Sequence, residues 1–159
     1  MLLSQLTEHI KFTSSSFRDL EIDDIVYDSR KASPGKLFVA LTGAFTDGHD
    51  YAESAYIKGA RAFLAERELS LPSDATVLVT ENSRAALGII SADFFGHPEK
   101  DISVIGVTGT KGKTTITHIL RHCLDECGIK SGVIGTIGAY YGDNFIPTVN
   151  TTPESYEIM

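Results

Sequence analysis

A glycine-rich turn between an apolar run and a helical segment constrains this chain more than any other feature. Residues 106–115 read Gly-Val-Thr-Gly-Thr-Lys-Gly-Lys-Thr-Thr, so the spacing is G-x-x-G-x-x-G-K-T. Glycines let backbone N–H groups turn inward and approach phosphate oxygens without a Cβ in the way. The turn therefore predicts a nucleotide phosphate site in a strand–loop–helix unit of an α/β protein.

Two side chains after the glycines have definite roles in such a site. Lys113 would reach the β- and γ-phosphates, and the Thr114 hydroxyl would hold Mg²⁺. Residues 114–127 are predicted to form a helix that ends at Gly128, and the positive end of its dipole adds to the anion site. The spacing departs from G-x-x-x-x-G-K-[ST], because Val107 stands where the first glycine is required. A glycine-rich turn with no ligand is the alternative.

The chain is expected to form two units that join in a breaker pair and a charge cluster at residues 96–101. We place the boundary between residues 98 and 99. Before it, strands are predicted at 25–27, 37–41, 62–65 and 76–79, with helices over 51–59 and from Asn82 or Ser83 to Phe94. After it, strands are predicted at 102–107 and 132–137, followed by a hairpin over 140–146. Strand, loop, helix and strand after the boundary predict the start of a parallel sheet.

Composition excludes several classes of protein. The 159 residues carry 14 Lys and Arg against 21 Asp and Glu, a net charge of −7, which disfavours general binding to nucleic acid or to an anionic membrane. A hydrophobic share of 42% excludes an intrinsically disordered chain. Two cysteines are too few for a disulfide framework, and no apolar run approaches the roughly 18 residues of a membrane span. The N-terminus is unlike a signal peptide, so we expect a cytoplasmic protein.

The helix predicted after the glycine-rich turn also carries two pairs of metal-ligating residues with i, i+4 spacing: His118, His122, Cys123 and Cys127. At roughly 100° per residue, the cysteines lie on the apolar face of this helix, and the histidines lie more than about 100° away. The four side chains therefore do not converge on one metal ion. We expect buried thiols and exposed imidazoles.

Two polar loops before the boundary carry further candidate residues. Asp28-Ser29-Arg30 follows a predicted strand, where Asp and Ser can bond local backbone and Arg offers a planar fork for a phosphate. Residues 42–50, Thr-Gly-Ala-Phe-Thr-Asp-Gly-His-Asp, form a second loop rich in turn formers. Taken singly, each loop is explained by ordinary turn chemistry, and His49 by a capping role.

Together these segments resemble the Mur ligase family. Residues 108–115 are similar to the ATP loop of that family, with Lys111 where Asn is commonest. Asp28-Ser29-Arg30, the run at 34–40 and Asp47-Gly48-His49 resemble the N-terminal domain of the Mur ligases that add the third residue or the terminal dipeptide. Asn-Thr-Thr-Pro-Glu at 150–154 resembles the third-residue-adding (MurE) type and favours it over the dipeptide-adding (MurF) type.

The resemblance implies an α/β protein with a small substrate-binding domain at 1–98 and the beginning of a P-loop parallel-sheet ATPase domain at 99–159. ATP would be bound by Gly109, Thr110, Lys111, Gly112, Lys113, Thr114 and Thr115. Within that set Lys113 would act catalytically at the transferred phosphoryl group, and Thr114 would bind Mg²⁺. The UDP-muramyl peptide would be bound by Tyr27, Ser29, Arg30, Ala44, Phe45, Thr46, Asn150, Thr151 and Thr152.

The implied reaction is ATP-dependent amide ligation in peptidoglycan synthesis. ATP would phosphorylate the terminal carboxylate of UDP-N-acetylmuramoyl-L-alanyl-D-glutamate, and the amine of diaminopimelate or lysine would attack the acyl phosphate. The resemblance also implies a monomer, and it puts the family's metal carboxylates and amino-acid-binding domain beyond Met159, so we expect no turnover by this chain alone. The alternatives are a dipeptide-adding ligase, a module that binds ATP or sugar nucleotide without ligating, and an unrelated P-loop NTPase or kinase.

Overall fold

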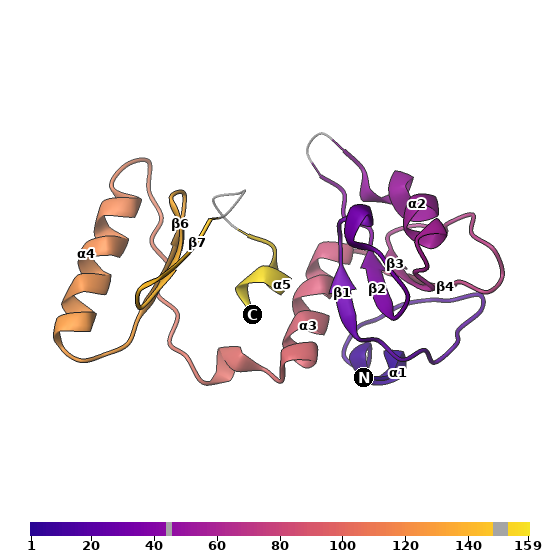
Figure 1. Cartoon of the computed structure of the whole chain (residues 1–159), viewed down its shortest axis with the longest axis horizontal. Helices are drawn as coiled ribbons and strands as arrows, with labels where there is room; N and C mark the ends of the chain where they lie inside the picture. Colours follow the sequence, from indigo (N-terminus) through magenta and orange to yellow (C-terminus); the bar gives the residue numbers. More distant parts are fainter. Residues whose placement is uncertain (44–45, 148–152) are drawn as a thin grey trace. The chain divides into compact units, whose positions relative to one another are not determined.

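The computed structural model describes residues 1–43, 46–147 and 153–159, and it divides into two compact units, Met1–Lys100 and Asp101–Ile158, called unit 1 and unit 2 below. Both are shown in Figure 1. The division follows the 3₁₀ turn η3 (Pro98–Lys100), in the charge cluster where the sequence suggested a boundary. Within the described residues, no helix has the length and apolar character needed to cross a membrane.

Unit 1 is built on a four-stranded parallel sheet. Its strands are β1 (Asp24–Val26), β2 (Lys36–Val39), β3 (Ala62–Ala65) and β4 (Thr76–Val79), hydrogen-bonded in that order. The register pairs Ile25 with Leu37, Leu37 with Ala62 and Ala62 with Thr76. Short apolar runs of this kind are typical of strands that are covered on both faces. All four strands confirm the sequence prediction, although β2 ends at Val39 rather than at residue 41.

Helices cover both faces of this sheet. On one face Phe38 and Phe63 lie edge to face, with ring centroids 6.0 Å apart, and pack with the alanines of α2 (Ala52–Ile57). Because side chains alternate along a strand, Leu37 and Leu64 point to the opposite face. The helices α1 (Leu3–Leu6) and α3 (Ser83–Phe95) bury their apolar residues there. The fully buried helix side chains are Leu3, Leu6, Leu87 and Ile90.

The ends of the longer helix in unit 1 follow from local capping. The Asn82 side chain accepts a hydrogen bond from the Ala85 N–H at 2.8 Å, which satisfies one of the free donors at the start of α3. The helix ends at Gly96, whose φ of +74° is a conformation that favours glycine. These two signals were readable in the sequence, and both ends are confirmed. Short 3₁₀ helices, η1 (Ser29–Lys31) and η2 (Gly48–Tyr51), follow β1 and β2 in the chain.

Unit 2 consists of one long helix and an antiparallel sheet. The helix α4 (Lys113–Glu126) is followed by β5 (Gly132–Gly135), β6 (Gly138–Tyr141), β7 (Asn144–Ile146) and the short helix α5 (Ser155–Ile158). The three strands pair in chain order. The helix ends before Gly128, at φ +74°, and the β6–β7 hairpin turns at Gly142, at φ +54°. Both features confirm the sequence prediction.

The sheet of unit 2 differs from the prediction in two respects. No strand forms at 102–107 in the described chain, and Ile102, Val104 and Ile105 there are 63%, 79% and 62% exposed. A strand needs a neighbour that accepts and donates its ladder hydrogen bonds, and the described strands of unit 2 pair only with one another. The expected start of a parallel sheet in unit 2 is therefore wrong for the described residues. The α/β class is confirmed, with the parallel sheet in unit 1.

Candidate functional site

The glycine-rich turn leads directly into α4. Gly109 and Gly112 have φ values of +149° and +79°, which side chains rarely adopt. Gly112 is the N-cap, and the Ile116 N–H donates to the Gly112 carbonyl at 2.9 Å as an early bond of the helix. The N–H groups of residues 113–115 therefore lie at the end of the helix that lacks backbone acceptors of its own. This end of a helix attracts anions.

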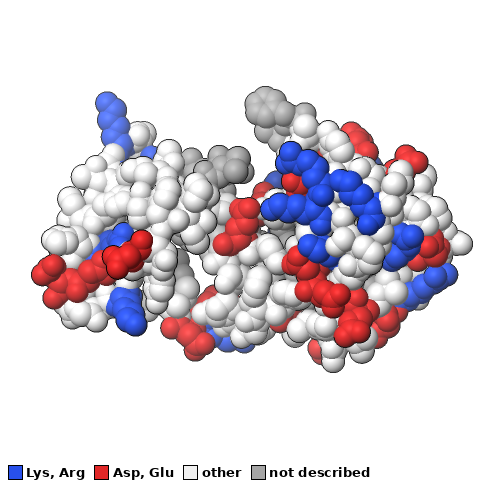
Figure 2. Space-filling view, viewed as in Figure 1, with Lys and Arg blue, Asp and Glu red and all other residues white. Residues whose placement is uncertain are grey.

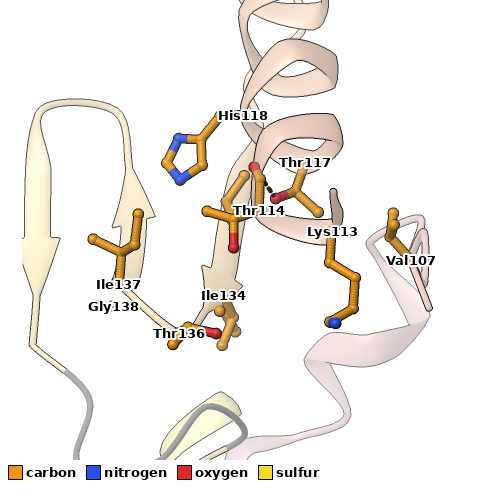
Figure 3. Close-up of a pocket in the computed structure, with 11 residues that line it drawn as sticks. Val107, Lys113, Thr114, Thr117, His118, Ile134, Thr136, Ile137 and Gly138 are labelled. Atoms are coloured by element: carbon orange, nitrogen blue, oxygen red, sulfur yellow. Dashed lines mark hydrogen bonds between the residues drawn. The ribbon is translucent and has the colours of Figure 1, made fainter. Parts of the chain in front are cut away.

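A cavity of about 210 Å³ lies between the start of α4 and the β5–β6 turn. Figure 3 shows Lys113 and Thr114 directed toward the end of this cavity where Ile134 and Thr136 lie. The Lys113 ammonium donates to the Gly109 carbonyl at 2.5 Å in an exposed bond. Because this bond is exposed, a phosphate oxygen can replace the carbonyl as acceptor at small cost. The first turn of α4 is further tied by the Thr117 hydroxyl, which donates to the Thr114 carbonyl at 2.9 Å.

The donor set at this turn fits nucleotide phosphates and Mg²⁺. An ammonium group and the backbone N–H groups of a helix start complement phosphate charge. Mg²⁺ prefers hard oxygen ligands, keeps several waters and takes one or two protein oxygens beside phosphate oxygens. The Thr114 hydroxyl, which lines the cavity beside Lys113, supplies such an oxygen. Residues 109–115, predicted as one set, are thus contiguous around the start of one helix.

The cysteines and histidines of α4 are placed differently from the prediction. Cys123 and Cys127 are both exposed, so the expectation of buried thiols is wrong. The reason is that no described element covers the apolar face of α4 on which they lie. His118, expected to be exposed, is half-buried beside Tyr140, with ring centroids 5.4 Å apart. His122 is exposed, as predicted.

The second set of candidate residues lies at the carboxyl edge of the sheet in unit 1. Parallel strands end at the same edge, and ligands of open α/β sheets bind outside it. Tyr27 and Ser29 follow β1, and Thr46 belongs to the loop after β2. The fold therefore brings these three residues to one edge of one sheet. The other predicted members, Ala44, Phe45, Asn150, Thr151 and Thr152, lie outside the described residues.

Arg30 forms a forked ion pair with Asp28. Its Nε donates to the two carboxylate oxygens at 2.9 and 3.0 Å, and its Nη2 donates to Oδ2 at 2.7 Å. These side-chain bonds outweigh partial burial and hold the pKa of Asp28 below its ordinary value, and Asp28 in turn raises the pKa of Arg30. The Arg30 side chain is nevertheless 85% exposed. Its role toward a phosphate stays a prediction.

His49 is a buried polar residue at this edge, with 5% of its surface exposed. Its Nδ1 donates to Asp47 Oδ1 at 2.5 Å, and its Nε2 accepts from the Glu66 N–H at 2.9 Å. A ring with one donating and one accepting nitrogen is neutral. The backbone N–H of His49, its ring and the Arg67 guanidinium together lower the pKa of Asp47 to about 2.

Glu66 extends this contact to the start of α3. Its Oε1 accepts from the Ser83 N–H at 3.0 Å, and its Oε2 accepts from the Thr42 hydroxyl at 3.4 Å. The Ser83 hydroxyl hydrogen is shared between the Ala40 carbonyl at 2.7 Å and Glu66 Oε1 at 3.1 Å. The bond from the Ser83 N–H, opposed by burial, lowers the pKa of Glu66. Sequence reasoning missed Glu66 and named Ser83 only as a possible start of the helix, although Glu66 directly follows a predicted strand, where polar residues of parallel sheets gather.

Comparisons with known proteins cover both units. Residues 21–95 match a family model described as "Mur ligase family, catalytic domain", and residues 107–159 match one described as "Mur ligase middle domain". A UDP-N-acetylmuramoyl-L-alanyl-D-glutamate–2,6-diaminopimelate ligase of Clostridium botulinum is 41% identical over 162 residues, which cover 100% of this chain and 34% of that protein. The chain thus spans about a third of the length of such curated relatives.

Among the solved structures that resemble the chain are one diaminopimelate ligase and one MurF ligase. A structure of a UDP-N-acetylmuramoyl-L-alanyl-D-glutamate–2,6-diaminopimelate ligase matches with a TM-score of 0.69 over 99% of this chain and 32% of that one, and at 24% identity this likeness concerns the fold alone. A MurF ligase of Thermotoga maritima in complex with ADP matches with a TM-score of 0.50 at 33% identity, over 69% of this chain and 25% of that one.

Proposed function

The chain belongs to the Mur ligase family, and we propose that it is a portion of a ligase that joins 2,6-diaminopimelate to UDP-N-acetylmuramoyl-L-alanyl-D-glutamate in peptidoglycan synthesis. In this proposal unit 1 binds the uridine diphosphate end of the substrate, and unit 2 carries the first part of the ATP site. The observation that carries it is the glycine-rich turn at the start of α4, in a chain 41% identical over its whole length to a ligase of that name.

ATP is the phosphoryl donor in the proposed reaction. The backbone N–H groups of residues 109–115 cradle the phosphates, and Lys113 neutralises negative charge that develops at the transferred γ-phosphoryl group. The Thr114 hydroxyl would hold Mg²⁺, which would supply positive charge beside the phosphates. Support comes from the positive φ values of Gly109 and Gly112, from the exposed Lys113 ammonium, and from the ADP held by a similar MurF structure.

The described members of the proposed substrate set follow β1 and β2 of the parallel sheet. In this proposal Tyr27, Ser29, Arg30 and the residues at 44–46 bind the uridine diphosphate, and residues 150–152 contact the muramyl peptide. The terminal carboxylate of the substrate attacks the γ-phosphorus and releases ADP. The amine of the incoming amino acid then attacks the acyl carbon of the acyl phosphate and releases phosphate. We place this reaction in the cytoplasm, where ATP is supplied.

Addition of the third residue is favoured over addition of a dipeptide. The relatives matched over the whole chain are named as diaminopimelate ligases. Diaminopimelate rather than lysine is proposed as the added residue because these relatives are named for it.

Calorimetric titration of the 159-residue chain tests the two-site proposal. We expect the wild-type chain to bind UDP, and to bind ADP in the presence of Mg²⁺. The Lys113→Ala variant should lose about tenfold or more in ADP affinity, since a charge-assisted bond contributes roughly 1.5–3 kcal/mol, and it should bind UDP as the wild type does. Lys130→Ala, which removes an exposed lysine of the same unit, is the matched control.

Absence of UDP binding by the wild-type chain would contradict the proposal for unit 1, and unchanged ADP affinity in Lys113→Ala would contradict it for unit 2.

A further inference from the structure

The contacts around His49 and Glu66 join the segments that follow β2 and β3 to the start of α3. We propose that His49 and Glu66 are positioning residues that fix the two ends of the turn closed by the Thr42–Asp47 bridge, and so place Gly43 and Thr46 to receive a uridine nucleotide. The identity of the ligand rests on the proposed function. The positioning role rests on the contacts themselves.

The base of this turn is closed by backbone contacts. Thr42 and Asp47 form an isolated antiparallel bridge, and the Gly43 N–H donates to the Thr46 carbonyl at 2.9 Å. The Gly48 N–H donates to the Leu41 carbonyl, also at 2.9 Å. A Cβ at residue 48 would lie 2.7 and 2.8 Å from backbone atoms of Leu41, so glycine is required for this close approach. The two ends of the turn are therefore fixed to each other.

His49 fixes the C-terminal end of the turn to β3. Its ring lies between the carboxylate of Asp47 and the backbone N–H of Glu66, at 2.5 and 2.9 Å. The same carboxylate accepts from the Arg67 guanidinium at 2.9 Å. Because the imidazole is buried, its two nitrogens have these protein groups as partners in place of water. Removal of the ring would leave the Glu66 N–H without its acceptor and Asp47 without one of its donors.

Glu66, which directly follows β3, fixes the N-terminal end of the turn to β3 and α3. Its carboxylate accepts from the Thr42 hydroxyl in the turn and from the N–H of Ser83 at the start of α3. A second bond holds the same end, because the Arg84 guanidinium donates to the Thr42 carbonyl at 3.3 Å. A carboxylate thus acts at each end of the turn. Asp47 belongs to the C-terminal end, and Glu66 contacts Thr42 at the N-terminal end.

These contacts lie outside the apolar core of unit 1. The core residues belong to the strands and to the helices on both faces, and the network begins where β2 and β3 end. Breaking it should therefore free the turn while the sheet stays folded. The network also holds two cations at the turn, Arg67 and Arg84, and Figure 2 shows Lys and Arg side chains grouped on part of the surface of unit 1.

Four variants of the full chain test the proposal, with UDP as the probe. His49→Ala removes both ring contacts, and His49→Gln keeps an acceptor for the Glu66 N–H. Glu66→Ala removes the carboxylate, and Glu66→Gln keeps acceptor oxygen for Ser83. We expect UDP affinity to fall about tenfold in the two alanine variants, the equivalent of about 1.4 kcal/mol, with most of it restored in Glu66→Gln and part of it in His49→Gln. His122→Ala, which removes an exposed histidine of unit 2, is the control.

Amide hydrogen exchange in the same variants separates positioning from folding. We expect faster exchange at Gly43 and Gly48 in the alanine variants, with the β3 amides as protected as in the wild type. Unchanged UDP affinity in His49→Ala and Glu66→Ala would overturn the proposal. So would affinity losses that match the unfolded fraction and are not restored by Glu66→Gln, because they indicate a role in stability alone. If the wild-type chain binds no UDP, the proposed function fails and the ligand assignment with it, and unchanged exchange at Gly43 and Gly48 would then overturn the positioning role as well.

Discussion

Unit 1 and unit 2 differ most in how they bury their apolar side chains. In unit 1 both faces of the sheet are covered, and Phe38, Phe63, Leu64 and Leu78 are at most 1% exposed. In unit 2, Val133 is the only buried residue among the described branched aliphatic and aromatic residues. Ile116 and Ile119 on α4 are 52% and 58% exposed. The fold of unit 1 therefore depends on long-range packing, and the described structure of unit 2 depends mainly on local hydrogen bonds.

The two candidate sites differ in the same way. The turn at 109–113 is shaped by glycine conformations and by a bond between residues four apart, from Lys113 to Gly109. The edge site of unit 1 is shaped by contacts between distant segments, such as the bond from the Ser83 N–H to Glu66, which are 17 residues apart. A phosphate loop can thus be formed by local sequence, whereas a site at the edge of a sheet requires the whole sheet to be in place.

The largest expected effect concerns the core of unit 1. Phe63 is fully buried, so Phe63→Ala should lower the free energy of unfolding by about 3–5 kcal/mol. Ile119→Ala, on the exposed face of α4, should change it by less than about 0.5 kcal/mol. Chemical denaturation followed by circular dichroism measures both changes. Equal losses of unfolding free energy in the two variants would contradict the difference in packing between unit 1 and unit 2.

A smaller loss is expected at the edge network. Ser83 is fully buried, and its hydroxyl contacts the Ala40 carbonyl and Glu66. Ser83→Ala should lower the free energy of unfolding by about 1–3 kcal/mol, because it removes the hydroxyl that donates to the buried Ala40 carbonyl. Ser91→Ala is a matched control, since the Ser91 hydroxyl is buried without a hydrogen-bond partner in the described structure. A loss in Ser91→Ala as large as in Ser83→Ala would argue against the network.

Alanine substitutions at two glycines of unit 2 distinguish an effect of backbone strain on stability from an effect on ligand binding. Gly112 at the start of α4 and Gly128 after its end both have positive φ, +79° and +74°. Alanine at either position should cost roughly 1–2 kcal/mol of stability, because a side chain is strained in this region. Calorimetry with ADP should then show weaker binding for Gly112→Ala alone. Equal ADP affinities in the two variants would argue against a phosphate cradle at Gly112.

The smallest expected effect is a dependence of stability on pH that involves Asp47. The pKa of Asp47 is lowered from 3.8 to about 2 in the folded protein. Its contribution to stability is therefore present in full above the unfolded pKa and is lost as the pH falls from about 4 toward 2. Asp47→Asn should be less stable than the wild type at neutral pH and should lose less stability on acidification. Thermal unfolding between pH 2 and pH 7 measures this, and parallel pH profiles for the two proteins would contradict it. The pKa values of Asp28 and Glu66 are also lowered in the folded protein, so part of the pH dependence of stability should remain in Asp47→Asn.

Local signals in the sequence predicted much of the fold. The bounds of β3 and β4 follow from short apolar runs between turn residues, and those of α3 and α4 follow from Asn82, Gly112 and glycines at their ends. The strand prediction at 102–107 was wrong, because an apolar run forms a strand only beside another strand that shares its backbone hydrogen bonds. For the same reason, the order strand, loop, helix and strand did not determine whether the strands of unit 2 pair in a parallel or an antiparallel direction.

The candidate sites were predictable to different degrees. Lys113 and Thr114 were predicted as site residues because the glycine-rich turn is contiguous in sequence. Asp47 and His49 were noticed as turn residues, but nothing in the sequence indicated that the imidazole accepts from the Glu66 N–H. The contact between Glu66 and Ser83 was missed, since only the parallel order of β2 and β3 and the packing of α3 bring them together. Their position just after a strand and at a helix start is the signal that could have found them.

We propose that the chain carries two separate nucleotide sites, one for a uridine nucleotide in unit 1 and one for an adenine nucleotide in unit 2. The most direct test is to titrate ADP with Mg²⁺ into the chain after saturation with UDP. We expect ADP to bind to the saturated chain with one site per chain and with the affinity that it has for the free chain. Displacement of UDP by ADP, or loss of ADP binding in the saturated chain, would contradict two separate sites.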